Sequence, residues 1–274
     1  MRLTTLIEDI SGGVHDLVPQ HGLSFLIESR DRTVLFDMGQ DGTFIRNAES
    51  LGLDLTKVDA GIISHGHYDH GGGLSSFLAC APHAPVYLKA GAGEASYARD
   101  IRGYRYIGLD TGIVAAEAGR LTWISTDTEI FPGFMLITDI LDPEPSPPGN
   151  RALLLRRQEN YTPDPFLHEL FLVVDEDDGI SIITGCGHSG ILNMVYTAKE
   201  RYPGRPVKAV AGGFHLTDRE TPPQLVRYIG KALKSAGCGR VITGHCTGSR
   251  AKEILREEFG NRFAAVFTGY STWI

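Results

Sequence analysis

Six consecutive residues contain four side chains that bind divalent metals well. The segment reads HGHYDH, and its candidate ligands are three imidazoles and one carboxylate: His65, His67, Asp69 and His70. Imidazole nitrogens and carboxylate oxygens suit zinc and related ions. One tetrahedral zinc would not draw four ligands from so short a loop. We therefore predict a two-metal site, in which a bridging water is activated as hydroxide.

Three more histidines follow apolar runs in glycine-rich loops, and these are His188, His215 and His245. In α/β sheets, ligands gather beyond the strand ends, where several loops converge on one crevice. Glycine lets the chain turn sharply and approach an ion closely. The repeated arrangement predicts that these histidines share a site with the HGHYDH segment.

The elements that must position these side chains are short strands, first in hairpins and then alternating with helices. The pattern predicts strands at 2–7, 23–29, 33–36, 58–63, 84–88, 171–174, 180–184, 207–211 and 240–243. It predicts helices at 44–51, from about 74, and at 191–201, 224–236 and 251–259. Two mixed β-sheets flanked by helices follow, which is a four-layer αββα sandwich in the α/β class.

The middle of the chain is less regular. Residues 142–149 read DPEPSPPG, a proline-rich loop that cannot lie inside a sheet. We expect a single domain over residues 1–274, with a substrate-covering insertion at about 91–165, because long irregular insertions are often functional. A variable surface excursion is the alternative. Within it, residues 97–106 combine arginines with tyrosines, which could hold a phosphate and a flat ring, or could be an ordinary solvated stretch.

Charge and composition restrict the classes of molecule that the protein is expected to bind. The formal net charge of −7 argues against broad binding to nucleic acid or to an anionic membrane. No apolar run approaches the roughly 20 residues that span a bilayer. Four widely spaced cysteines form no C-x-x-C pair, which favours reduced thiols and a cytoplasmic location. A small anionic substrate is the expected partner, and the oligomeric state is left open.

The HGHYDH segment resembles the signature loop of the metallo-β-lactamase superfamily, and the likeness extends over most of the chain. FDMG at 36–39 resembles its early aspartate segment, and TGH at 243–245 resembles its late histidine ligand. DMGQ, SHGHYDHGGGL, TGCGHSGILN, GGFHL and GHCTG together resemble one subfamily. Its members are labelled 7,8-dihydropterin-6-methyl-4-(β-D-ribofuranosyl)aminobenzene 5'-phosphate synthases. Fold and subfamily alone do not fix a substrate.

The resemblance implies two sets of metal ligands. The first comprises His65, His67 and His188, and the second comprises Asp69, His70 and His245. Superfamily members usually supply the third histidine earlier in the chain, where only His168 is available. Its surroundings do not match a glycine-rich histidine loop, so His188 is preferred, and His168 is expected to be a surface or strand-edge histidine.

Two residues depart from the superfamily pattern. Cys186 stands where many members have a bridging aspartate, and its thiol could ligate zinc or simply pack in the interior. His215 has no clear metal position and could serve as a general acid, bind an anionic group, or be a hydrogen-bonded loop histidine. Asp69 and His215 are the candidate catalytic residues.

The predicted function is a metal-dependent hydrolase for an anionic small molecule, a phosphoester or a phosphorylated pterin-type compound. Zinc is the default metal, and iron or manganese suit similar ligands. The alternatives are a pterin-condensing synthase and a metal-containing ligand sensor with little turnover. A di-iron redox role is disfavoured because such members carry Glu where this chain has His67. β-Lactam hydrolysis is disfavoured by the expected cytoplasmic location.

Overall fold

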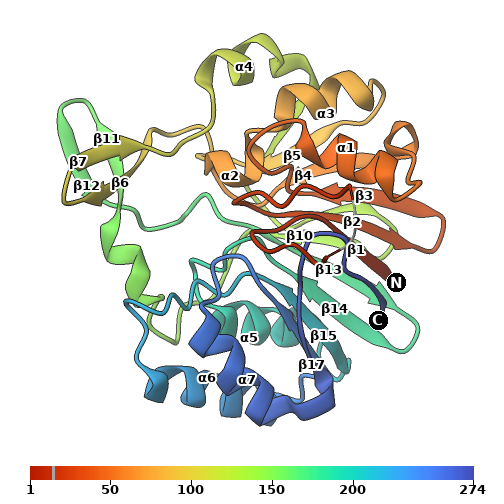
Figure 1. Cartoon of the computed structure of the whole chain (residues 1–274), viewed down its shortest axis with the longest axis vertical. Coiled ribbons are helices and arrows are strands. Elements are labelled where there is room, and N and C mark those ends of the chain that lie inside the picture. Colours follow the sequence, from red (N-terminus) through yellow and green to blue (C-terminus); the bar gives the residue numbers. More distant parts are fainter. Residues whose placement is uncertain (14–15) are drawn as a thin grey trace. The chain divides into compact units, whose positions relative to one another are not determined.

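Two seven-stranded mixed β-sheets dominate the structure, a computed structural model that describes residues 1–13 and 16–274 (Figure 1). The chain divides into two compact units, each containing one of these sheets. Unit 1 comprises Met1–Ser125, Asn150–Glu169 and Phe267–Trp273, and unit 2 comprises Thr126–Gly149, Leu170–Val266 and Ile274.

The sheet of unit 1 has the strand order β18-β1-β2-β3-β4-β5-β8. Its strands are β1 Arg2–Ile7, β2 Ser24–Ser29, β3 Arg32–Phe36, β4 Ala60–Ile63, β5 Val86–Lys89, β8 Leu121–Ile124 and β18 Ser271–Trp273. The first four strands in this order pair antiparallel, and the rest run parallel from β3 to β8. The helices are α1 Thr43–Ser50, α2 Tyr68–Gly71, α3 Leu74–Cys80 and α4 Thr111–Ala116. Phe44 of α1 and Phe77 of α3 are fully buried with strand residues such as Leu35.

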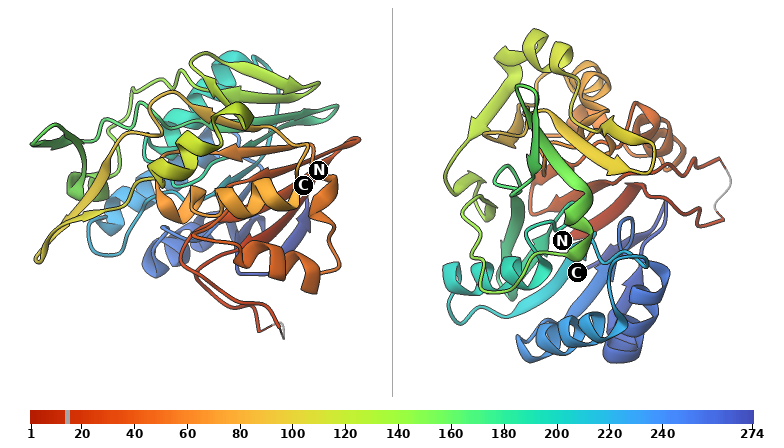
Figure 2. Two further views of the ribbon diagram at one scale, coloured as in Figure 1. Left: turned by 90° about the horizontal axis from the view of Figure 1, so that it is seen from above. Right: turned by 90° about the vertical axis from the view of Figure 1, so that its left-hand side faces the viewer.

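Unit 1 also carries a four-stranded antiparallel sheet, which we call the arm. It has the order β12-β11-β6-β7, built from β6 Ser96–Asp100, β7 Gly103–Tyr106, β11 Leu153–Arg157 and β12 Asn160–Pro163. The arm extends away from the large sheet of the same unit (Figure 2). The region that the sequence presents as irregular therefore contains regular strands. Strands β6 and β7 form one hairpin, and β11 and β12 form another. The pairing of β6 with β11 joins residues more than fifty positions apart, as between Ala98 and Leu153, and local patterning carries no sign of that pairing.

The sheet of unit 2 has the order β17-β16-β15-β14-β13-β10-β9. Its strands are β9 Thr128–Phe131, β10 Phe134–Ile137, β13 Phe171–Glu176, β14 Gly179–Ile183, β15 Val207–Gly212, β16 Arg240–Thr243 and β17 Phe263–Ala265. Strands β14 to β17 run parallel, so the chain leaves β14, β15 and β16 at one edge. Helices α5 Ile191–Arg201, α6 Pro223–Ser235 and α7 Ser249–Phe259 cover one face of this sheet (Figure 1).

The predicted fold class is confirmed, because two large mixed sheets with flanking helices are present. The strands predicted at 2–7 and 240–243 and the helix predicted at 191–201 have the observed bounds of β1, β16 and α5. The proline-rich loop at 142–149 lies outside the strands, as expected.

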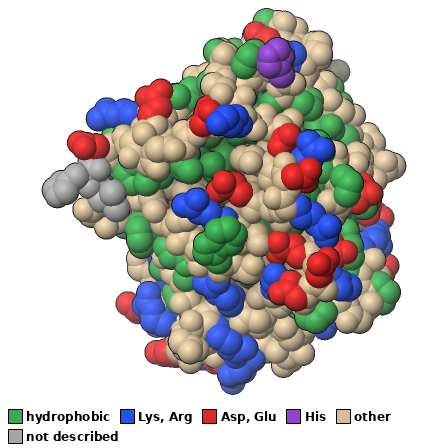
Figure 3. All heavy atoms as spheres, turned by 90° about the vertical axis from the view of Figure 1, so that its right-hand side faces the viewer, with side chains coloured by type: hydrophobic (Ala, Val, Ile, Leu, Met, Phe, Trp, Pro, Cys, Tyr) green, Lys and Arg blue, Asp and Glu red, His purple; other side chains and the backbone are tan. Residues whose placement is uncertain are grey.

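No helix in the described part of the chain is long and apolar enough to cross a membrane. On the face drawn in Figure 3, basic and acidic side chains are interspersed. Ion pairs such as Arg205–Asp175 and Lys208–Glu176 bring opposite charges into contact. Charges of both signs are therefore mixed on this face.

Candidate metal centre

The HGHYDH segment, which we call the metal loop (residues 65–70), follows β4 and continues into α2. Gly66 is required there, since a Cβ atom would lie 2.2 Å from the carbonyl oxygen of Ala92. The loop is also fixed from its other side, where His67 forms a β-bridge with Gly108 and the Tyr68 N–H donates to the Ile107 carbonyl at 2.9 Å. Backbone contacts therefore set the path of the loop.

Asp37, directly after β3, orients the ends of this loop. Its Oδ1 accepts the Ser64 N–H at 2.8 Å, and its Oδ2 accepts the Ser64 hydroxyl at 2.8 Å. The same Oδ2 lies 2.6 Å from His70 Nδ1, and Ser64 Oγ lies 2.9 Å from His65 Nδ1. All four residues are buried. A histidine that donates Nδ1–H to a carboxylate or hydroxyl keeps the lone pair on Nε2, as in carboxylate–histidine–metal triads.

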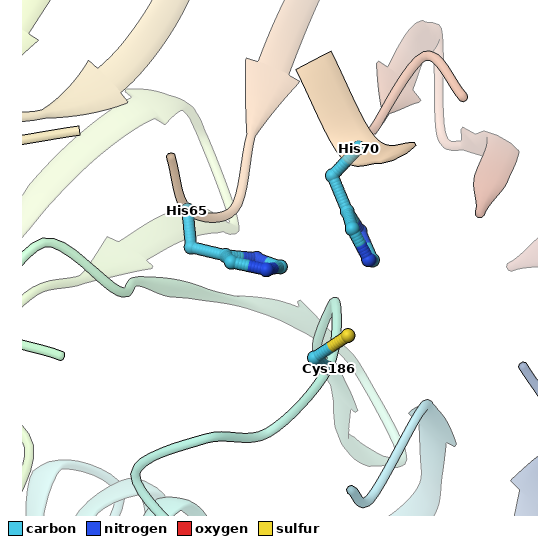
Figure 4. Close-up of side chains that lie close together, drawn as sticks. All are labelled: His65, His70 and Cys186. Atoms are coloured by element: carbon cyan, nitrogen blue, oxygen red, sulfur yellow. The ribbon is translucent and has the colours of Figure 1, made fainter. Parts of the chain in front are cut away.

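The ligand atoms of the metal loop fall into two pairs. His65 Nε2 lies 3.0 Å from His67 Nδ1, and His70 Nε2 lies 3.8 Å from the Asp69 Oδ2. The rings of His65 and His70 are themselves close, with centroids 4.3 Å apart, and both project from the loop in Figure 4. These are the pairs that the sequence assigns to a first and a second ion.

The chemistry of this donor set fits divalent metals. Burial lowers the pKa of His67 from 6.5 to about 3, so its imidazole is neutral at physiological pH. A metal requires the neutral imidazole, which can offer a lone pair. Burying four polar side chains in one short loop costs free energy unless they have partners. One or two bound cations would offset that cost.

His168 is not a surface or strand-edge histidine, and that expectation is wrong. Its side chain is buried, its Nδ1 accepts the Gly66 N–H at 3.2 Å, and its Nε2 lies 3.1 Å from Asp164 Oδ2. Burial raises the pKa of Asp164, but the hydrogen bonds from His168 and the Phe166 N–H, together with the nearby imidazoles of His168 and His67, outweigh burial, and the net shift of the pKa is downward. Both ring nitrogens of His168 are thus engaged. The residue buttresses the metal loop through Gly66.

His21 is a site residue that the sequence interpretation missed. Its Nε2 lies 3.3 Å from Asp69 Oδ2, and its Nδ1 lies 3.0 Å from Asp9 Oδ2. The carboxylate of Asp69 therefore has a second imidazole, besides that of His70, close to its Oδ2. His21 lies in no recognisable motif, so only the folded chain identifies it.

Unit 2 brings together residues from the loops after β14, β15 and β16. Cys186, drawn in Figure 4, lies in the first loop, His215 in the second and Cys246 in the third. One ligand atom from each falls within 4.8 Å of the other two. His188 and His245 are both buried, and the ring centroid of His188 lies 4.2 Å from that of His215.

The Cys246 thiol has an unusual environment. Burial raises its pKa, but hydrogen bonds with Cys186 and His215 and the nearby imidazole of His245 outweigh burial, so the pKa falls well below 9.0. In contrast, burial raises the pKa of Cys238 to about 12. A lowered pKa favours the thiolate, which is the form of cysteine that binds metals.

The fold, the buried HGHYDH loop and its orienting aspartate define a class of metal-binding proteins. Residues 17–202 match the family model of the metallo-beta-lactamase superfamily. The chain belongs to the metallo-β-lactamase superfamily, as the sequence motifs predicted. The chain is 30% identical over 282 residues to the 7,8-dihydropterin-6-methyl-4-(beta-D-ribofuranosyl)-aminobenzene-5'-phosphate synthase of Methanocaldococcus jannaschii. That match covers 98% of this chain and 95% of the relative.

Solved structures agree with the assignment. The crystal structure of Tm1679, described as a metal-dependent hydrolase of the beta-lactamase superfamily, has a TM-score of 0.85 and 31% identity. It matches over 100% of this chain and 99% of its own. The short form of human tRNase Z matches over 100% and 99% of the two chains with a TM-score of 0.56 and 13% identity, which shows a shared fold alone.

Proposed function

We propose that this protein is a metal-dependent hydrolase that acts on a phosphorylated, pterin-type small molecule at a dinuclear centre. The observation that carries the proposal is the hydrogen-bonded series from Asp37 to His70 and through Ser64 to His65, which directs two buried imidazole Nε2 lone pairs into one space. Within unit 1, His65 and His67 would hold the first ion, and Asp69 and His70 would hold the second.

The residues of the chain have separate tasks in this proposal. Bound divalent metal supplies Lewis acidity and makes water a better nucleophile near neutral pH. Asp37 keeps His70 and, through Ser64, His65 in the tautomer that offers Nε2. Asp69, held by His21, is the carboxylate placed to accept a proton from the attacking water.

A hollow beside the metal loop is the proposed place for the substrate ring. Tyr68, Tyr106, Gln40 and Asp110 are among its lining residues. The guanidinium carbon of Arg105 lies 5.7 Å from the centre of the Tyr68 ring. A planar heteroaromatic group can stack on tyrosine, and arginine can pair with a phosphate. The region at 91–165 would thereby contribute substrate contacts through β7.

The test combines metal content with turnover. Purified protein would be assayed against phosphomonoesters, phosphodiesters and phosphorylated pterins, before and after metal removal and reloading with zinc, iron or manganese. His67→Ala and Asp69→Ala should each lower metal content, and turnover should fall by more than the roughly 10–100-fold that loss of an outer partner costs. His83→Ala, at an exposed position, is the control. Full activity in the metal-depleted protein would overturn the proposal.

The contribution of Arg105 can be measured separately. Arg105→Ala should raise KM for a phosphorylated substrate about tenfold, as expected for loss of roughly 1.4 kcal/mol from a charge-assisted contact. Arg102, exposed at the β6–β7 turn, provides the matched control, and Arg102→Ala should leave KM unchanged. Equal KM values for the two variants would show that Arg105 does not contact the substrate.

A second candidate function is pterin condensation, favoured by the similarity over 98% of the chain to a relative named as a synthase. Incubation with dihydropterin pyrophosphate and an aminobenzene acceptor separates the two. Release of diphosphate with formation of a new carbon–nitrogen or carbon–carbon bond supports the synthase, whereas water as the acceptor supports the hydrolase. A protein with two metals and no turnover in any of these assays would instead be a ligand sensor.

A further inference from the structure

The thiols of Cys186 and Cys246 and the imidazole of His215 gather within unit 2. We propose that these three side chains form a zinc site of their own, with two sulfur donors and one nitrogen donor and without a ligand from the metal loop. This site lies beyond the proposed function, which uses nitrogen and oxygen donors. Zinc is the expected ion because thiolate and imidazole ligands together suit it.

The spacing of the donors is close to that of a bound ion. One ligand atom from each of the three residues lies within 4.8 Å of the other two. Tetrahedral zinc with Zn–S bonds of about 2.3 Å holds its sulfur ligands roughly 3.8 Å apart. Rotation of a side chain by a small amount is sufficient to close the difference. Three protein ligands leave the fourth position for water or another small ligand.

A buried ring nitrogen without a hydrogen-bond partner supports the proposal that this cluster binds an ion. His215 Nδ1 is buried and has no hydrogen-bond partner among the described residues. An orphaned polar atom of this kind is costly in an apolar interior, and an ion is one of its ordinary explanations. Zinc bound between this imidazole and the two sulfurs would satisfy it.

The backbone is arranged around the sulfur of Cys246. The His215 N–H donates to Cys246 Sγ at 3.2 Å, which is the type of contact that stabilises a thiolate ligand. A Cβ atom at Gly213 would lie 2.5 Å from the same sulfur, so only glycine permits this approach. His215 also has a left-handed backbone, with φ of 47°, which is uncommon outside glycine. Such conformations persist where the surroundings enforce them, often at functional sites.

Cobalt(II) titration of the reduced, metal-depleted full chain tests the site. Sulfur ligation produces an intense near-ultraviolet sulfur-to-cobalt charge-transfer band, which nitrogen and oxygen ligands do not. We expect the band in the wild-type protein and in Cys80→Ser, a control thiol on α3 of unit 1. Cys246→Ser should remove most of the band, and His215→Ala should weaken cobalt affinity about tenfold or more. An unchanged band in Cys246→Ser would overturn the proposal.

A measurement on the wild-type protein tests the same proposal even if one of the variants fails to fold. X-ray absorption of the zinc-loaded wild-type chain should contain a zinc–sulfur shell at about 2.3 Å. If zinc saturates the protein and that shell is absent, the site does not exist.

Variants of the metal loop separate this site from the proposed function. In His67→Ala and Asp69→Ala, we expect turnover to fall while the sulfur-to-cobalt band persists. Loss of the band in these variants would mean that the thiols serve the metal loop's ions, which overturns an independent site and leaves the proposed function standing. If these variants keep both their turnover and the sulfur-to-cobalt band, the proposed function is overturned and the sulfur site stands.

Discussion

The two units hold candidate metal ligands of different chemistry, and they position them by different means. In unit 1, nitrogen and oxygen donors are oriented by other side chains, with Asp37 and Ser64 fixing the imidazoles of His65 and His70. In unit 2, sulfur and nitrogen donors are positioned by backbone, through the close approach of Gly213 and the N–H of His215 to Cys246 Sγ.

This difference indicates how each region should respond to mutation. A side-chain network depends on the charge and hydrogen-bonding capacity of a few groups, so isosteric changes should disrupt it. A backbone cradle depends on space, so the addition of a single methyl group should disrupt it. Four substitutions or conditions test this contrast.

The largest effect should come from Asp37→Asn in unit 1. The amide keeps the shape of the carboxylate but cannot accept hydrogen bonds from Ser64 N–H, Ser64 Oγ–H and His70 Nδ1–H together. Metal affinity should fall about 10–100-fold, the usual cost of losing an outer-shell partner. Competition with a chelator of known affinity measures this. Asp59→Asn, which alters the Arg32 pair in the same unit, is the control. Equal affinities would show that Asp37 does not orient the ligands.

A steric change should have the next largest effect, in unit 2. Gly213→Ala places a methyl group 2.5 Å from Cys246 Sγ and 2.8 Å from the Gly185 carbonyl oxygen. Overpacking of this kind costs about 1–3 kcal/mol, and backbone on one side leaves little room for relief. The unfolding midpoint in urea should fall, and the sulfur-to-cobalt band should weaken.

Gly230→Ala provides the matched control for this substitution. Gly230 lies inside α6, and its added methyl would meet the flexible Glu258 side chain at 3.2 Å. Alanine is favoured over glycine in helices by up to about 1 kcal/mol, so the control should be neutral or stabilising. A Gly213→Ala protein as stable as wild type would contradict the backbone cradle.

A smaller effect is expected when the support of the metal loop is removed at His168. His168→Ala leaves the buried Gly66 N–H and the Asp164 carboxylate without this partner, at a cost of about 1–3 kcal/mol. Part of that cost should be recovered by water in the vacated space. Thermal unfolding and metal content measure the result. Replacement of the exposed His83 by alanine should change neither quantity, and an equal effect of both substitutions would rule out the buttressing role.

Local patterns predicted well where the candidate ligands lie along the chain. The metal loop follows β4, and the glycine-rich loops with His188, His215 and His245 follow β14, β15 and β16, as predicted. That these side chains bind metal stays a prediction. β1, α5 and β16 have the predicted bounds. Their strand or helix periodicity is visible in the order of apolar and polar residues along a short stretch of sequence.

Long-range contacts explain what the sequence did not reveal. His168 reaches Gly66 across 102 positions of the chain, and its immediate neighbours carry no sign of that contact. His21 meets Asp69 in the same way. The arm pairs β6 with β11 although its tyrosines and arginines resemble an irregular surface segment. The Cys186, His215 and Cys246 cluster likewise joins three loops that look unrelated along the chain.

The smallest effect should be a pH-dependent one, at an ion pair that supports the scaffold of unit 2. Asp127 accepts the Thr138 N–H at 2.8 Å and the Arg201 Nε–H at 3.0 Å. Partial burial raises its pKa, but the hydrogen bonds from Thr138, Arg201 and the Asp139 N–H, together with the charge of Arg201, outweigh burial, and the pKa lies below 3.8. A carboxyl group whose folded-state pKa is depressed stabilises the protein fully above its unfolded-state pKa, near 3.9, and loses this contribution as pH falls through the folded-state value.

Asp127→Asn should therefore lower stability at pH 7 by less than about 1 kcal/mol, as for other partly exposed ion pairs. The difference from wild type should shrink as the pH falls through the folded-state pKa of Asp127, which lies below 3.8, because the wild-type carboxyl is then itself protonated. Urea unfolding at pH 7 and over a series of acidic pH values measures this, with the exposed Asp142→Asn as the control in the same unit. A deficit that persists unchanged in acid would mean that Asp127 acts through shape and not charge, and unit 2 would then depend on packing here as it does at Gly213.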